Sequence, residues 1–362
     1  MSIINPYADV DWQNCETIVS VTHAHAKNQE QFDLLYAGGL RHIAISNYYR
    51  SEPFYPVVNG KVSGIETVET INIPTDCVPC PNAEHHNMNI DALHICTVGS
   101  FFSSGSPEGS APKSMDEKSW KALIKSAVHM LQFPDAGGLT INHPTWSDLS
   151  MTNIFAILDY TKYVLGIEAC NTDLAGDLQY WDNVLITGRR AWGFFVPDHK
   201  HKWQEAQHGE EGKLAKIGQW RGRNVLIVPQ KTEHECLKAY RNGHFFGRLY
   251  NTDLSFTNIS LSGQNVTYAT NKATSITVIE DGIKTTYNGS SCTHTVSAGA
   301  TYVRAEASRD YTFEYNDGSE VTKKDVIYSQ PITFKPFTPR RQDTWEFEAN
   351  SKKFSFPKML WL

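Results

Sequence analysis

The chain has 362 residues, of which 40% are hydrophobic, 12% aromatic and 20% charged, a composition typical of a folded globular protein. Its formal net charge of −6 provides no basic field for nucleic acid, and no run of about 18 apolar residues predicts a membrane span. The length favours one large domain and one smaller domain, which we expect at residues 1–245 and 246–362.

The N-terminal residues and the cysteines indicate the compartment. The first fifteen residues lack the basic and apolar regions of a secretion signal, although a signal already removed would leave no trace. The seven cysteines are an odd number, and Cys77 and Cys80 form a lone CxxC without a second pair at zinc-ribbon spacing. We therefore expect reduced thiols and a cytoplasmic protein.

Up to about Tyr240, short apolar runs alternate with segments of helical periodicity. The apolar runs predict strands covered on both faces at 18–22, 42–46, 93–98, 138–142, 164–169, 192–196 and 225–228. Capping boxes at Ser114 and Thr232 predict helix starts, and Gly38 and Gly243 predict helix ends. This alternation predicts an α/β fold with a parallel sheet or barrel.

After Phe246 the pattern changes to short runs that often alternate between apolar and polar residues. Turn signals such as Asp281-Gly282 and Asn288-Gly289 separate these runs. The pattern predicts a small antiparallel β-sandwich as the second domain.

Histidines and carboxylates recur where the predicted strands end, whereas His94 lies within a predicted strand and Glu84 lies in a predicted loop just before that strand. The set comprises His23, His25, Glu84, His94, His143, Glu168, Asp198, His199 and His201. Taken singly, each can be a structural core or loop residue, but strand ends of α/β folds converge at one edge. Imidazole and carboxylate groups are ligands of Zn²⁺, Mn²⁺ and Fe²⁺, and a carboxylate among histidines can bridge two ions. The pattern therefore indicates a metal site.

The order of these motifs resembles the PHP family, named for polymerase and histidinol phosphatase. The resemblance implies a distorted seven-stranded β/α barrel with two or three metals at its C-terminal face. Segments 181–195, 237–247, 302–307 and 326–332 are similar to the branch that carries a β-domain after the barrel. The barrel motifs are THAHA (22–26), GLRHIAISNYY (39–49), PNAEHHN (81–87), LHICTVGS (93–100), INHP (141–144), GIEACN (166–171) and GFFVPDHKH (193–201).

The resemblance also implies ligand roles. A first metal would be held by His23, His25, Glu84 and Asp198, and Glu84 would bridge to a second metal held by His94 and His143. The last family motif is usually Asp-x-His, whereas this chain has Asp-His-Lys-His at 198–201. His201 would take the place of the family histidine, and His199 is a further candidate ligand.

One departure from the family concerns its second motif, which normally ends in Asp-His. This chain has Asn47-Tyr48 there, and the family residues are ligands of a third metal. We therefore expect two divalent ions at most, Zn, Mn or Fe. Asn47 and Tyr48 are candidate substrate contacts, and Arg41 and Arg50 are candidate anion-binding residues for which a surface role is equally open.

The expected reaction is hydrolysis by a metal-bound hydroxide, with Asp198, His199 and His201 as candidate catalytic residues. His201 or His199 would donate a proton to the leaving group. The expected partner is a small-molecule phosphoester, which is the family's usual substrate, and carboxyl esters or amides are the alternative. A second class of function is a non-catalytic, metal-stabilised protein that binds a glycan or a protein partner. The sequence indicates no oligomeric state.

Overall fold

The structure is a computed structural model that describes residues 3–26, 28–46, 55–62, 65–87, 90–100, 115–131, 136–171, 173–198, 222–315 and 317–339. Within these ranges, the side chains of residues 58–62, 65–68, 86–87 and 90–92 are left undescribed. Five predicted site residues lie outside the described residues: Asn47, Tyr48, Arg50, His199 and His201. None of the helices in the described ranges combines the length and the apolarity needed to span a bilayer.

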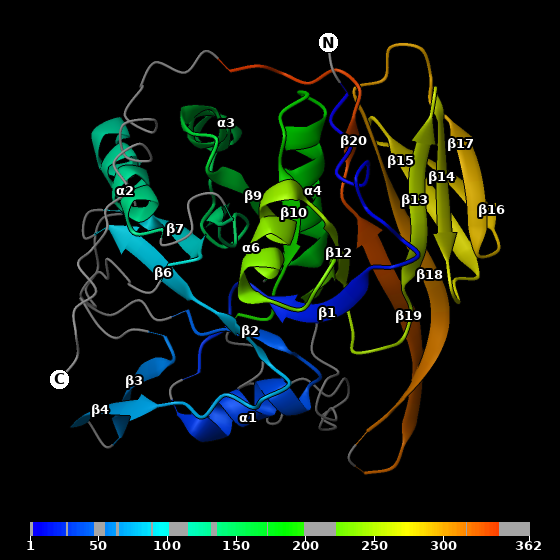
Figure 1. Ribbon diagram of the computed structural model, residues 1–362. Helices are drawn as coiled ribbons and strands as arrows, with labels where there is room; N and C mark the ends of the chain where they lie inside the picture. Colours follow the sequence, from blue (N-terminus) through cyan, green and yellow to red (C-terminus); the bar gives the residue numbers. More distant parts are fainter. Residues whose placement is uncertain are drawn as a thin grey trace.

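A ten-stranded mixed sheet runs through the molecule (Figure 1). Its strands are β1 (Glu16–Val21), β2 (His42–Ala44), β5 (Val78–Cys80), β11 (Arg223–Val228), β12 (Phe245–Arg248), β15 (Ser275–Glu280), β16 (Ile283–Asn288), β18 (Tyr302–Glu314), β19 (Glu320–Ser329) and β20 (Ile332–Thr333). They are arranged in the order β16-β15-β18-β19-β12-β11-β1-β2-β5, and β20 pairs with β18.

The other strands form three smaller sheets. A five-stranded sheet, in the order β10-β9-β8-β7-β6, contains β6 (Asn82–Asn87), β7 (Ile90–Val98), β8 (Gly138–Ile141), β9 (Val164–Cys170) and β10 (Trp192–Phe195). A three-stranded sheet contains β13 (Phe256–Ser262), β14 (Asn265–Thr270) and β17 (Ser291–Thr295). The last is the hairpin of β3 (Val57–Val62) and β4 (Ile65–Thr70).

Five helices occur in the described residues: α1 (Gln29–Ala37), α2 (Glu117–His129), α3 (Met151–Tyr160), α4 (Leu174–Leu185) and α6 (Glu233–Asn242). Helix α6 begins at Thr232, whose hydroxyl accepts a hydrogen bond from the Glu235 amide, and ends at Gly243 with φ 76°. The sequence predicted both ends. The N-cap of α2 is Asp116 rather than the predicted Ser114, which lies outside the described residues.

The predicted closed seven-stranded β/α barrel is wrong. The ladder hydrogen bonds form two separate sheets, and the pairs β6–β7, β7–β8 and β1–β11 are antiparallel. Only two residues separate β6 from β7, and so short a connection joins antiparallel neighbours. The continuous apolar runs correctly indicated burial on both faces, but they carry no information on strand direction.

The strands predicted for a C-terminal β-sandwich do not all form sheets of their own, because one of their two sheets continues into the N-terminal part. Strand β12 pairs with β11 on one side and β19 on the other, so one sheet runs without a break from β1 to β16. The three-stranded sheet packs on it through Ile259, Val266 and Tyr268, which share a core cluster with Ile276 and Val303. The division at residues 245 and 246 stays a prediction.

Two connections bring the two large sheets together around the residues of interest. Pro81 alone separates β5 in one sheet from β6 in the other. At the opposite edge, Ala24 forms a parallel bridge with Asp198, and the Asp198 amide donates to the His23 carbonyl over 3.1 Å. Segments that follow β1 and β10 are therefore held side by side.

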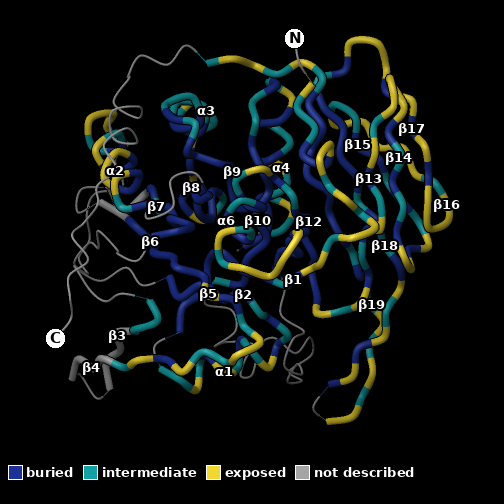
Figure 2. The backbone as a smooth tube through the Cα atoms, viewed as in Figure 1, coloured by how far each residue is buried: buried dark blue, intermediate teal, exposed yellow. Residues whose placement is uncertain are grey.

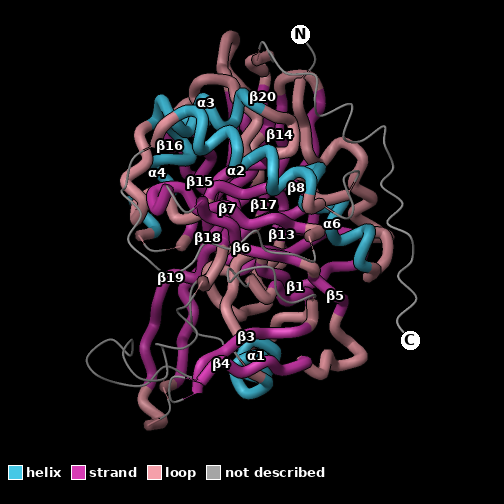
Figure 3. The backbone as a smooth tube through the Cα atoms, turned by 90° about the vertical axis from the view of Figure 1, so that its left-hand side faces the viewer, coloured by secondary structure: helices cyan, strands magenta, loops and turns pink. Residues whose placement is uncertain are grey.

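The surroundings of these sheets are layered. Figure 2 shows the central strands buried and the exposed residues concentrated on outer helices, hairpins and turns. Figure 3, together with Figure 1, shows α3 and α1 at opposite ends of the molecule, with α1 next to the β3–β4 hairpin. The apolar face of α2 (Trp120, Leu123, Ile124) belongs to the same core cluster as Ile95 and Ile141 of the five-stranded sheet.

Candidate metal centre

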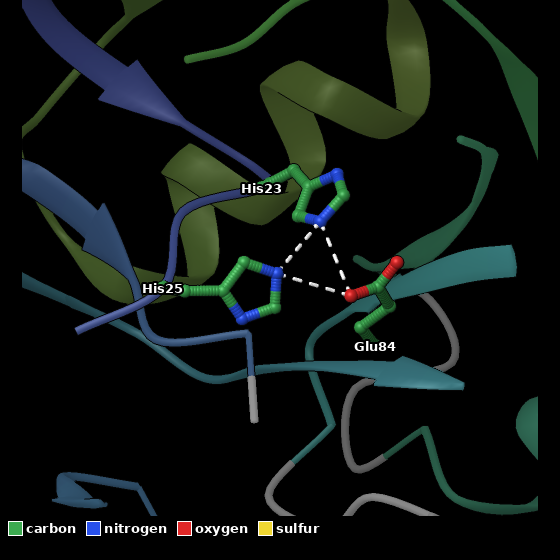
Figure 4. Close-up of side chains that lie close together, drawn as sticks. All are labelled: His23, His25 and Glu84. Carbon is green, nitrogen blue, oxygen red and sulfur yellow. Dashed lines mark hydrogen bonds and ion pairs between the residues drawn. The ribbon is translucent and has the colours of Figure 1, made fainter. Parts of the chain in front are cut away.

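Two histidines follow β1 and face the same space. His23 and His25 are alternate residues of an extended segment, so their side chains point to the same side. Both are buried, and their Nε2 atoms lie 3.0 Å apart (Figure 4). Two ring nitrogens this close, with their rings converging from one backbone segment, form half of a ligand set.

Glu84 from β6 and Asp198 from the segment after β10 complete a group of four. Glu84 Oε2 lies 3.3 Å from His23 Nε2 and 3.1 Å from His25 Nε2 (Figure 4). Asp198 Oδ1 lies 3.3 Å and 3.4 Å from the same two nitrogens. Ligand atoms at ~2.0–2.1 Å from a tetrahedral zinc ion are about 3.3 Å from one another. These separations therefore fit one divalent ion at the centre of the four side chains.

Glu84 presents its other oxygen to a second pair of histidines. Glu84 Oε1 lies 3.0 Å from Nδ1 of His94 in β7 and 3.6 Å from Nε2 of His143, which follows β8. Ligand atoms of these three residues all lie within 4.8 Å of one another. A carboxylate whose two oxygens face two sets of imidazoles has the geometry of a ligand shared by two ions.

Buried hydrogen bonds orient two of the imidazole rings. Glu168 Oε1 in β9 lies 2.7 Å from His23 Nδ1, and its Oε2 accepts from the backbone amide of His143, also at 2.7 Å. Ser147 Oγ lies 3.1 Å from His143 Nδ1. A partner on one ring nitrogen fixes the tautomer and leaves the other nitrogen for a metal. Both rings therefore present Nε2 to the centre.

Two asparagines connect the carboxylates. Asn171 donates from Nδ2 to Glu168 Oε2 over 2.7 Å and lies 3.4 Å from Asp198 Oδ2. Asn142 donates from Nδ2 to Glu84 Oε1 over 3.1 Å. Each asparagine directly follows a buried strand, a position that the sequence analysis noted only for histidines and carboxylates.

The carboxylates of the centre are ionised at neutral pH. Burial raises the pKa of Glu84, but the charge of His23 and hydrogen bonds from the surrounding histidines outweigh it and hold the pKa well below its usual range. Burial likewise raises the pKa of Asp198, and His23 and His25 more than reverse that shift. The described residues that ion-pair with Glu84, Asp198 and Glu168 are all histidines.

The carboxylates of the centre in turn favour the protonated, positively charged form of His23. Burial lowers the pKa of His23, but nearby negative groups, Asp198 first among them, bring it well above its usual value. Buried anions require compensating positive charge, which either protons or metal ions can provide. The donor set of the centre thus fits divalent ions in both composition and spacing.

Backbone conformation also marks the centre. His143 has φ 27° and Asp198 has φ 49°, both in the left-handed region. Among the other described non-glycine residues, only Asp148 and Asp281 share it, and Asp281 lies in the turn between β15 and β16. Such conformations cost about 1–3 kcal/mol and cluster at functional sites.

A third group of close side chains, formed by His23, Cys96 and Glu168, does not suit a metal. The contact of 2.7 Å between Glu168 and His23 Nδ1 is a direct hydrogen bond and leaves no room for an ion between these atoms. Burial raises the pKa of the Cys96 thiol, which keeps it neutral, whereas the thiolate is the ligand form. We therefore assign this group to the support of His23.

Six predicted metal ligands come together in the structure: His23, His25, Glu84, His94, His143 and Asp198. Glu84 lies in strand β6 rather than in the predicted loop. The sequence included Glu168 in the pattern that indicates a metal site but assigned it to neither ion, and it did not single out Asn142, Ser147 or Asn171.

Arg41 lies elsewhere. It precedes β2, at the end opposite the centre, and its Nε donates to Asp76 Oδ2 over 2.8 Å. The roles predicted for Asn47, Tyr48, Arg50, His199 and His201 concern residues outside the described ranges and stay predictions.

Comparison with known proteins gives little further information. No protein-family model and no curated protein matches the chain. Among solved structures, it is similar to a two-domain protein from Bacteroides vulgatus ATCC 8482, described as containing a predicted PHP-like metal-dependent phosphoesterase. The identity is 12%, the match covers 87% of this chain and 96% of the other, and the TM-score is 0.44, too low to establish a shared fold.

Proposed function

We propose that the chain is a metal-dependent hydrolase that cleaves ester bonds, phosphoesters first, at a site for two divalent ions. The observation that best supports this proposal is the division of the Glu84 carboxylate, with Oε2 3.1 Å from His25 and Oε1 3.0 Å from His94. A purely structural ion needs four ligands and no shared carboxylate, whereas paired ions are common in enzymes that hydrolyse phosphoesters.

Some residues of the centre would bind the ions, and others orient the residues that bind them. His23, His25 and Asp198 would hold a first ion, His94 and His143 a second, and Glu84 both. Two divalent ions held there would lower the pKa of a water molecule towards neutrality and would neutralise charge that develops on the ester oxygens. Glu168 and Ser147 hold the rings of His23 and His143, so these ligands require little rearrangement when a substrate binds.

The exposure of the candidate ligands supports a proposal for the side from which a substrate reaches the centre. The side chains of Asp198 and His94 are 17% and 14% exposed, whereas those of His23 and Glu84 are almost fully buried. We propose that the substrate enters on the side of Asp198 and His94. His199 and His201 follow Asp198 in sequence and remain our proposed proton donors to the leaving group.

The test is turnover after controlled metal loading. Metal-stripped protein would be reconstituted with Zn²⁺ or Mn²⁺ and assayed with 4-nitrophenyl phosphate, bis(4-nitrophenyl) phosphate and 4-nitrophenyl acetate. We expect metal-dependent hydrolysis of at least one phosphoester, with a slower or absent reaction on the acetate. A preference for the acetate would change the substrate class to carboxyl esters. Stoichiometric metal without turnover of any ester would contradict the hydrolase and favour a metal-stabilised binding protein.

A further inference from the structure

A tryptophan with an exposed ring stands beside the second pair of histidines. Trp146 is 51% exposed, and it is the one tryptophan among the exposed large hydrophobic residues of the described chain. Its ring centroid lies 4.9 Å from that of His143, at an interplanar angle of 80°, and 5.7 Å from that of His94, at 62°. The indole thus contacts both imidazoles, while about half of the surface of the residue as a whole stays exposed to solvent.

The loop that carries Trp146 is fixed on both sides of it. The Ser147 amide donates to the His143 carbonyl over 3.0 Å, and the Thr145 hydroxyl donates to Asp177 Oδ1 over 2.6 Å. Ser147 also contacts the His143 ring, as described above. The same short loop therefore positions a candidate ligand and the exposed indole, which makes their relative placement rigid.

Burial explains a tryptophan at this position only in part, because Trp146 is 51% exposed. Burial of an indole removes a large apolar area from water, and a half-exposed one on a rigid loop gives up much of that gain. Exposed aromatic rings next to a polar site are instead typical of ligand contacts, because the flat face binds other rings while the indole loses little conformational entropy.

We propose that Trp146 forms one wall of the substrate site. Its indole would select esters that carry a ring with an apolar face, either aromatic or pyranose, next to the scissile bond. This substrate class rests on the proposed hydrolase function. Since Trp146 contacts His94 and His143 directly, the matching ring is one bonded to the ester oxygen itself or through one further atom. An open-chain alkyl ester fits the same ions without contacting the indole.

The first test measures binding without turnover. Phenylphosphonate, methylphosphonate and glucose 1-phosphate would be titrated into metal-loaded protein by calorimetry, with the wild type, Trp146→Ala and Trp146→Phe. We expect Trp146→Ala to weaken phenylphosphonate binding about 5- to 10-fold and to leave methylphosphonate within about 2-fold. Trp146→Phe would restore most of the loss. If Trp146→Ala also binds glucose 1-phosphate more weakly, the indole contacts both pyranose and aromatic rings. If glucose 1-phosphate binds equally well, the indole selects aromatic rings alone.

The control is Ile283→Ala, which removes another exposed apolar side chain on the distant strand β16 and should change none of these affinities. Equal losses for phenylphosphonate and methylphosphonate in Trp146→Ala, or no loss for either ring-bearing ligand, would overturn the proposal. Metal content would be measured in each variant to separate ligand loss from metal loss.

The second test separates this proposal from the proposed function. If esters are hydrolysed, Trp146→Ala should raise KM for phenyl phosphate about 5- to 10-fold and leave kcat within about 2-fold. If no ester is hydrolysed but phenylphosphonate binding depends on Trp146, the proposed hydrolase function is wrong and the proposed ring contact of Trp146 is supported. If the wild type and Trp146→Ala hydrolyse phenyl phosphate with the same KM, the hydrolase function is supported and the proposed role of Trp146 is wrong.

Discussion

Replacing Glu84 by glutamine tests the proposal that its carboxylate is shared by two ions. The change keeps the shape of the side chain, removes its negative charge and turns one ligand oxygen into an amide NH₂. Glu84 Oε2 faces His23 and His25, and Oε1 faces His94 and His143, so the substitution alters both ligand groups at once.

The size of the effect follows from the position of Glu84. Removing a group that merely orients a metal ligand lowers affinity about 10- to 100-fold. Glu84 contacts both proposed ion positions itself, so we expect a loss of more than about 100-fold for each ion, or about 2.7 kcal/mol each. Both ions should be lost together.

The assay is metal content by mass spectrometry after dialysis, followed by titration calorimetry with Mn²⁺ and Zn²⁺. Glu117→Gln is the matched control, because Glu117 is 73% exposed on α2 and should leave metal content unchanged. Two ions retained in Glu84→Gln would refute the reasoning. Loss of one ion with the other bound normally would show that the carboxylate serves a single site.

Three further outcomes follow from the structure. Glu168→Gln, which weakens the support of His23, should lower metal affinity about 10- to 100-fold by calorimetry without unfolding the protein; unchanged affinity would contradict its orienting role. Burial lowers the pKa of His42 to about 3 in the folded protein. Between about pH 6.5 and pH 3, His42 therefore binds a proton in the unfolded chain but not in the folded protein. The free energy of unfolding should therefore fall as the pH decreases through this range. The loss reaches roughly 5 kcal/mol, and urea unfolding should show a shallower pH dependence in His42→Asn; identical slopes would exclude the effect. Asp182→Asn removes a carboxylate that accepts from Arg304 over 2.7 Å and should cost about 2–3 kcal/mol in urea unfolding, whereas a loss below about 0.5 kcal/mol would show that the pair is solvent-screened.

The sequence predicted the local elements better than their arrangement. Every strand predicted before residue 245 overlaps an observed one, because long apolar runs report burial on both faces. Their directions depend on connections such as the two-residue link between β6 and β7, which periodicity does not reveal. The pairing of β12 with β19 likewise joins residues about 80 positions apart, beyond the reach of any local pattern.

The ligand residues could be predicted because of their chemistry and their position at strand ends. His94 and Glu84 were exceptions to the strand-end position. His94 lies within β7, and the strand β6 of Glu84 reads as a polar loop (NAEHHN). In β6, alternation directs Glu84 to the centre, while His85 bonds to Thr97. The supporting residues were missed because asparagine, serine and threonine are common in loops for other reasons. Trp146 could not be distinguished in sequence from a core tryptophan, since only its exposed fraction marks it.

The most direct test of the metal centre is a crystal structure of the protein grown with Mn²⁺ or Zn²⁺, with anomalous data collected at the absorption edge. We expect two anomalous peaks, one among His23, His25 and Asp198 and one beside His94 and His143, with a Glu84 oxygen next to each. The proposed metal centre would be contradicted if the protein hydrolysed esters in the presence of the same metal ion but its crystals showed no anomalous peak among these side chains.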